Sequence, residues 1–181
     1  MKLKQITACL VAATMFGSNP VFAQSAPKVS GDVIKIGVLT DLSSTYSDLA
    51  GPGAVIAAKM AIADFSKDGT VIGKKIELLS ADHQNKPDIA KNITQQWFDR
   101  EKVDATFENL NSAVALAVSA LGAEKNRLTV ITGAATSRLT NEDCRPATSI
   151  HWVYDTNALA TVVGKAVVQS GGDSWYFLKI E

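Results

Sequence analysis

Three segments of the sequence combine small side chains with hydroxyl groups: residues 41–53 (DLSSTYSDLAGPG), 108–114 (ENLNSAV) and 132–140 (TGAATSRLT). Each follows an apolar run and precedes a helical pattern or a turn. The free backbone N–H groups at the start of a helix bind anions, and glycine or alanine lets a ligand approach the backbone closely. The three segments therefore predict a site that holds a small carboxylate without any charged side chain.

Particular residues in two of these segments suit such contacts. Asn111 or Ser112 can cap the following helix, which leaves the N–H groups of Ala113 and Val114 at its start. The threonine and serine of the third segment can do the same one strand later. Capping alone accounts for any single segment, whereas three segments in register favour a ligand site. The residues expected to contact the ligand here are Asn111, Ser112, Ala113, Thr136 and Ser137.

Catalytic and metal-binding patterns are weaker. Asp82 and His83 could form part of a triad, but adjacent residues of an extended segment point to opposite sides, and no G-x-S-x-G elbow precedes a helix. His83 is therefore expected to be a hydrogen-bonded loop residue. The two histidines and Cys144 lie in unrelated segments, which argues against a metal site. We expect no enzymatic activity, no catalytic residue, no metal and no cofactor.

Aromatic side chains offer a second kind of ligand contact. Trp97 lies on the apolar stripe of a predicted helix and is expected in the core. Tyr46, Trp152 and Tyr154 lie in a strand-end loop and in a crossover, where an aromatic ring can stack on the apolar part of a ligand.

Composition narrows the class of protein. The chain has 181 residues, 46% of them hydrophobic, with 18 basic and 18 acidic residues, so no nucleic-acid partner is expected. Residues 1–23 combine two lysines, an apolar run and a terminal VFA, which predicts a secretory signal peptide cut after Ala23. The mature chain would then have a single cysteine, Cys144, and no internal disulfide.

Strand and helix patterns alternate between these segments. The apolar residues Ala54, Ala58, Ile62 and Phe65 give the first predicted helix one apolar face, and Gly69 is its stop signal. Strands are predicted at 33–40, 75–82, 103–107, 127–132, 148–154 and 174–178, and helices at 54–68, 86–102, 112–126 and 155–172. This alternation predicts an α/β fold, a doubly wound parallel sheet with helices on both faces.

The strand order then places the site. Ligands of open parallel sheets bind beyond the carboxyl ends of the strands, where the strand order reverses. If the second predicted strand lies on one side of the first and the third lies on the other, all three small-residue segments line the same crevice.

The order of several segments, including IKIGVLTDLSSTYSDLAGPG, NSAVALAV, EKNRLTVITGAATSRLT and HWVYDTNALA, resembles the type I solute-binding proteins of ABC importers. This family includes Leu/Ile/Val-binding and aromatic-carboxylate-binding proteins. The resemblance implies a two-lobed clamp in the periplasm that delivers a small carboxylate, an amino acid or an aromatic acid, to an inner-membrane permease. It also implies that Ser112, Ala134 and Thr136 hold the head group and that Tyr46 and Tyr154 contact the ligand.

The resemblance covers about residues 32 to 178, and family members run to about twice this length. It therefore implies a binding lobe over residues 24–150, with a crossover and the beginning of a second lobe at 151–181. Without a second wall a ligand would be less enclosed than in usual pockets, so we expect an incomplete copy whose present function is open. The alternatives are a sensor lobe that acts on a protein partner, an exported hydrolase, and an inert fragment.

Overall fold

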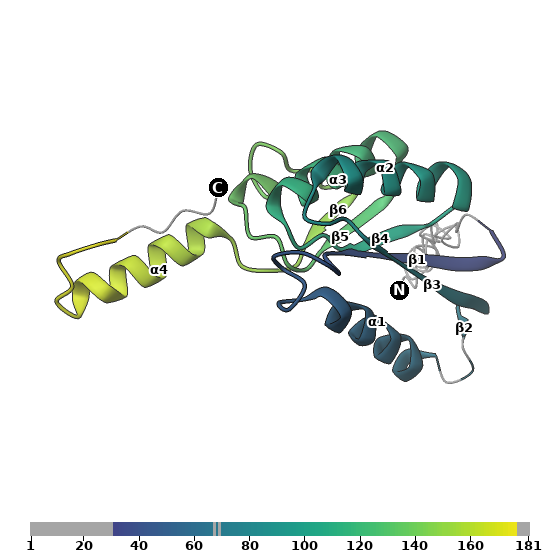
Figure 1. Ribbon diagram of the computed structural model, residues 1–181, viewed down its shortest axis with the longest axis horizontal. Helices are drawn as coiled ribbons and strands as arrows, with labels where there is room; N and C mark the ends of the chain where they lie inside the picture. Colours follow the sequence, from purple (N-terminus) through teal and green to yellow (C-terminus); the bar gives the residue numbers. More distant parts are fainter. Residues whose placement is uncertain (1–30, 67, 69, 177–181) are drawn as a thin grey trace, which may run out of the picture.

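The computed structural model describes residues 31–66, 68 and 70–176. The predicted signal peptide with its cleavage point at Ala23 and the predicted stop signal at Gly69 lie outside these residues. One sheet of six strands organises the chain, in the order β2-β3-β1-β4-β5-β6 (Figure 1). The strands are β1 (Val33–Thr40), β2 (Thr70–Val71), β3 (Lys74–Asp82), β4 (Ala105–Glu108), β5 (Leu128–Ile131) and β6 (Ser149–His151).

The strand order confirms the arrangement expected from the sequence. β3 and β4 flank β1 in parallel, and β5 and β6 continue the parallel sheet beyond β4. The sequence did not predict β2, which pairs antiparallel with the start of β3 through a tight turn. Ile72 and Gly73 form that turn with positive φ values of 51° and 75°, a conformation that glycine adopts without strain.

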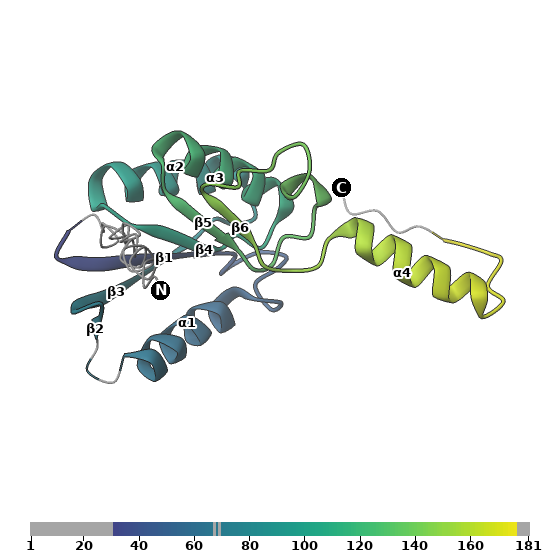
Figure 2. The same cartoon turned by 180° about the vertical axis from the view of Figure 1, so that it is seen from behind.

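Helices cover both faces of the sheet, as predicted. They are α1 (Gly51–Phe65), α2 (Pro87–Gln96), the π-helical turn η1 (Trp97–Glu101), α3 (Ser112–Lys125), the 3-10 turn η2 (Ser137–Leu139) and α4 (Thr156–Gln169). Helices α2 and α3 lie side by side on one face and α1 lies on the other (Figures 1 and 2). The predicted helix at 86–102 changes from α to π geometry at Trp97.

The principal core lies between the sheet and the α2–α3 layer. It consists of Leu39, Ala90, Trp97, Phe98, Val103, Val114, Val118 and Leu121. Gly37 makes room for the indole, because a Cβ atom at this position would overlap the ring of Trp97. The prediction that Trp97 belongs to the core is therefore confirmed, and a residue without a side chain in β1 is what accommodates it.

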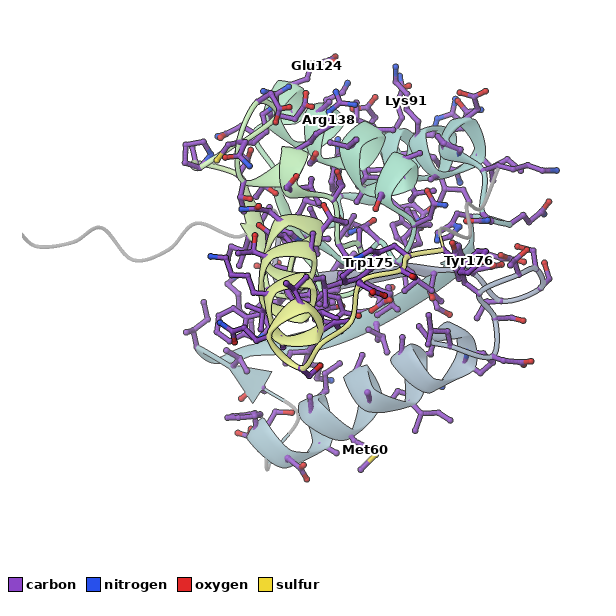
Figure 3. All side chains as sticks on the ribbon, turned by 90° about the vertical axis from the view of Figure 1, so that its left-hand side faces the viewer. Met60, Lys91, Glu124, Arg138, Trp175 and Tyr176 are labelled. Carbon is purple, nitrogen blue, oxygen red and sulfur yellow. The ribbon has the colours of Figure 1, made fainter. Side chains whose placement is uncertain are left out.

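The opposite side of the molecule is much less covered. Only Gly51 is buried in α1, and Phe65, predicted on its buried face, is 86% exposed. Met60 points away from the sheet (Figure 3). Helix α4 extends away from the sheet beyond β6 and has no buried residue (Figure 1).

The last two predicted strands differ from the structure. Strand β6 ends at His151, earlier than predicted, although the Trp152 N–H still donates to the carbonyl oxygen of Ile131 at 2.8 Å. The strand predicted at 174–178 is absent from its described part, residues 174–176. Since β6 pairs with β5, the sheet continues one residue past the lobe boundary expected at 150.

Candidate functional site

The loops after β1, β4 and β5 meet at the carboxyl edge of the sheet. In Figure 1 this is the edge from which α4 extends, and Figure 3 views the molecule from that side. Parallel pairing of β1, β4 and β5 brings their carboxyl ends together. The three small-residue segments singled out in the sequence therefore lie along one edge, where ligands of open α/β sheets bind.

Two aspartates shape the loop after β1. Asp41 is buried, and its carboxylate accepts hydrogen bonds from the N–H groups of Ser44 at 2.9 Å and Tyr46 at 2.8 Å. The Ser44 hydroxyl adds a third bond at 2.6 Å. Asp82, at the end of β3, accepts from the hydroxyl of Ser43 at 2.5 Å. The loop is thus a turn built around two carboxylates, and it holds the half-buried Tyr46 at the edge of the sheet.

The environment of these aspartates favours their ionised forms. Burial, the largest single influence, raises the pKa of Asp41, but the hydrogen bonds that it accepts bring the pKa below its usual value. The same balance holds for Asp82, whose pKa is also lowered. Both carboxylates are therefore occupied in organising the loop, and neither is poised as an acid or a base.

His83 behaves as a structural residue, as the sequence indicated. Its side chain is fully buried, and its Nδ1 accepts the N–H of Asn85 at 2.9 Å. Burial lowers the pKa of His83, while Asp41 and Asp82 oppose this shift. Its neutral ring closes the turn between β3 and α2.

The start of α3 supplies the first part of the candidate site. Of the two possible caps, Asn111 is the one used, because its Oδ1 accepts the N–H of Val114 at 3.0 Å. That N–H is therefore not available to a ligand, contrary to the expectation from the sequence. Ser112 is half-buried and Ala113 is exposed, and the Ser112 hydroxyl has no hydrogen-bond partner among the described residues. The helix start therefore offers a ligand this hydroxyl and the earliest backbone N–H groups.

The loop after β5 supplies the second part, with fewer groups available to a ligand than expected. Thr136 is the cap of η2, accepting the N–H of Arg138 at 3.4 Å. The Ser137 N–H lies 3.4 Å from the hydroxyl of Thr156, and the carbonyl oxygen of Ala135 accepts the Thr156 N–H at 2.8 Å. Because η2 is a single 3-10 turn, it has little of the dipole that a longer helix start provides.

Ala134, which the resemblance assigns to the head group, is a buried residue. Its side chain is 1% exposed and packs with Ala115, Ile131 and Leu139 in a second core cluster. His151 Nε2 lies 2.7 Å from the Ala134 carbonyl oxygen. The carbonyl oxygen of Ala134 is therefore engaged by His151, and its side chain belongs to the core beneath the loop.

The structure brings some predicted residues together and separates others. The loops of α3 and η2 are joined directly, through a hydrogen bond between Glu108 and Thr132 at their bases. Tyr154, on the segment between β6 and α4, is 62% exposed and touches neither core cluster. Sequence reasoning missed Glu108 and Asp41. The available signal was a carboxylate at the end of a strand, directly before a turn.

None of the helices in residues 31–66, 68 and 70–176 has the length and hydropathy of a membrane span. Within the same part of the chain, no group of three or more histidine, cysteine, aspartate or glutamate residues is arranged to hold a metal ion.

Comparisons with known proteins agree with this geometry. The family model described as periplasmic binding protein matches residues 33–179. A periplasmic binding protein from Burkholderia mallei is 47% identical, with a TM-score of 0.74, over 78% of this chain and 37% of that one. A branched-chain amino acid ABC transporter periplasmic ligand-binding protein from Burkholderia xenovorans is 39% identical, with a TM-score of 0.70, over 76% and 36%.

A more distant solved structure carries a ligand. A solute-binding protein of an ABC transporter from Rhodopseudomonas palustris, in complex with 4-hydroxybenzoate, is 27% identical with a TM-score of 0.65, over 77% of this chain and 37% of that one. Among curated proteins no match was found. The chain thus spans between a third and two fifths of the length of the solved proteins described above.

Proposed function

Because this chain belongs to the periplasmic binding protein family, we propose that it provides a ligand-binding lobe for the uptake of a small carboxylate by an ABC transporter. Export by the predicted signal peptide would place it in the periplasm, and its protein partner would be an inner-membrane permease. The observation that carries the proposal is the meeting of three small-residue loops at the carboxyl edge of the sheet, beside the start of α3.

The chemistry of that edge favours a carboxylate. The α3 start combines a partly positive helix terminus with the unengaged hydroxyl of Ser112. A branched-chain amino acid and 4-hydroxybenzoate, named for two of the similar proteins, share a carboxylate next to an apolar body. Tyr46 and Tyr154 would contact that apolar body. The Ser112 hydroxyl and the backbone N–H groups of Ala134 and Thr136 would donate to the carboxylate.

Binding of matched ligand pairs tests the proposal. Purified full-length chain is titrated calorimetrically with 4-hydroxybenzoate and leucine, and in parallel with 4-hydroxybenzamide and leucinol, which lack the carboxylate. We expect one of the acids to bind and its uncharged partner to bind at least about tenfold more weakly, since a hydrogen bond to a charged group contributes about 1.5–3 kcal/mol. If neither acid binds, or acid and uncharged partner bind equally, the proposal is wrong.

A variant pair locates the site. In Ser112→Asp the new carboxylate would repel an anionic ligand, yet it sits at the first position of α3, where a negative charge stabilises a helix. We therefore expect lost binding with unchanged or slightly raised thermal stability. The control is Thr161→Asp in the middle of α4, which should leave binding intact.

A further inference from the structure

Glu108 joins the bases of the two candidate ligand loops. It is the last residue of β4, and Thr132 is the first residue after β5. The hydroxyl of Thr132 donates to Glu108 Oε2 at 2.5 Å, and the Thr132 N–H donates to the Glu108 carbonyl oxygen at 3.1 Å. The Asn111 cap follows three residues after Glu108, and the Thr136 cap follows four residues after Thr132. The start of α3 and the loop after β5 are therefore tied together where they leave the sheet.

Gly133 is fitted to this contact. A Cβ atom at Gly133 would lie 2.8 Å from Glu108 Oε1 and 2.6 Å from Leu110 Cδ1. The sequence suggested that small residues in this loop admit a ligand to the backbone. At this position the absent side chain instead makes room for the carboxyl group of Glu108. We call the combined contacts of Glu108, Thr132 and Gly133 the interlock of the two loops.

The position of Glu108 is unfavourable for folding by itself. Its φ is +83°, in the left-handed region where most side chains are disfavoured, and the following Asn109 has a φ of +56°, which asparagine adopts more readily. Glu108 is only 8% exposed, and its Oε1 has no hydrogen-bond partner among the described residues. Burial raises the pKa of Glu108, and the Thr132 hydrogen bond opposes this only in part. Strain and a buried carboxyl at the same residue, next to a binding edge, are typical of a functional constraint.

From these observations we infer that Glu108 is the positioning residue of the binding edge: its carboxyl group fixes the spacing between the start of α3 and the 132–137 loop. The interlock stands on the contacts of Glu108, Thr132 and Gly133. Its importance for ligand affinity rests in addition on the proposed function. Replacing a residue that only stabilised the sheet would lower the free energy of unfolding. Strain and a buried carboxyl make the replacement of Glu108 neutral or favourable for that free energy, so a loss of loop order without a loss of stability identifies the positioning role.

Three variants separate the two roles. Glu108→Gly relieves the left-handed strain and removes the carboxyl group. Thr132→Val removes only the hydroxyl at an exposed residue. Glu108→Gln keeps the shape and can still accept the Thr132 hydroxyl. The matched control is Thr129→Val, which makes the same change on β5 at a buried residue whose hydroxyl has no partner among the described residues.

The measurement is amide hydrogen exchange in the full-length chain. In Glu108→Gly and Thr132→Val we expect exchange within residues 111–114 and 133–139 to become faster by about tenfold or more, while the melting temperature of Glu108→Gly is unchanged or higher. Glu108→Gln and Thr129→Val should exchange like the wild type in both loops. If Glu108→Gly leaves both loops as protected as before, or if Thr129→Val loosens them equally, the interlock is not what orders the edge.

Titration of the same variants with 4-hydroxybenzoate and leucine tests the consequence for binding. We expect affinity of the bound acid to fall about tenfold in Glu108→Gly and Thr132→Val and to persist in Glu108→Gln. Loops that loosen without any loss of affinity would contradict the role in binding. If the wild type binds neither acid, the proposed function fails, while the exchange experiment still decides whether Glu108 orders the loops.

Discussion

Helices α3 and α4 have the same length, fourteen residues, and begin in the same way. Asn111 accepts the Val114 N–H at 3.0 Å, and Asp155 accepts the Ala158 N–H at 2.7 Å. Six residues of α3 are buried, and none of α4. Local sequence thus determines where each helix begins and ends, whereas an opposing surface determines whether its apolar side chains stabilise the fold.

The largest expected difference concerns a buried charge. Val118 of α3 is completely buried in the principal core, whereas Val162 of α4 is 68% exposed. Val118→Asp should lower the free energy of unfolding by more than about 4 kcal/mol, because an unpaired carboxylate would have to be buried. Val162→Asp should change it by less than about 0.5 kcal/mol. Urea denaturation followed by circular dichroism measures both, and similar losses would show that α4 is packed in solution.

Two helical glycines should respond with opposite signs. A Cβ atom at Gly122 in α3 would lie 2.5 Å from the Thr129 hydroxyl and 3.0 Å from the Arg127 carbonyl oxygen, whereas nothing lies within 4 Å at Gly164 in α4. Gly122→Ala should destabilise the protein by about 1–3 kcal/mol through overpacking. Gly164→Ala should stabilise helix α4 by up to about 1 kcal/mol and so raise its helical content. Thermal melts and helical content measure both variants. If both substitutions stabilise the protein, or both destabilise it, the contrast between the two helices is wrong.

The two caps allow a finer comparison. Asn111→Ala and Asp155→Ala each remove one hydrogen bond worth about 1 kcal/mol. Because α3 is packed on the sheet, the loss at Asn111 should appear in the global melting temperature. Because α4 is unpacked, the loss at Asp155 should appear as local fraying, with faster amide exchange at Ala158 and an unchanged global melt. A shared change in global melting temperature would contradict this.

A smaller, pH-dependent change in thermal stability is expected at Glu108, the last residue of β4. Burial raises the pKa of Glu108 in the folded state above the value of about 4.3 typical of an unfolded chain. Its contribution to stability is then complete below pH 4.3 and is lost as pH rises through the folded-state pKa. Glu108→Gln does not undergo this loss, so its melting temperature should exceed that of the wild type increasingly from pH 4 to pH 8.

The control for this pH series is Glu124→Gln, at an exposed residue of α3. Asp41 and Asp82, whose pKa values are lowered, lose their contribution as the pH falls. They do so equally in wild type and variant, so they cancel in the difference between the two melts. A difference that is constant across the pH range, or that reverses, would show that Glu108 is not the titrating group.

The parallel fold was predictable from the sequence because strand and helix patterns alternate without interruption from residue 33 onwards. Trp97 was correctly expected in the core, since its apolar stripe has a sheet to face. Phe65 was wrongly expected on a buried face. Periodicity identifies an apolar face but not the surface opposite it, and the described residues provide little cover for α1.

The candidate site was predictable in its location but not in its internal bonding. The three loops lie at the expected edge, because parallel pairing alone brings them there. Which groups remain available to a ligand depends on contacts distant in sequence, such as Thr156 with Ser137 and Thr132 with Glu108. No spacing rule indicates that a carboxylate at the end of β4 will turn toward the residue after β5.

The fit between Gly37 and Trp97 restricts the order in which the two positions can change over generations. A first substitution that adds a side chain at Gly37 meets the indole and is removed by selection through overpacking. A first substitution that shrinks Trp97 leaves a cavity, costly but open to later filling from Gly37. A larger residue at Gly37 with a smaller one at Trp97 can therefore arise in one order, with the substitution of Trp97 first.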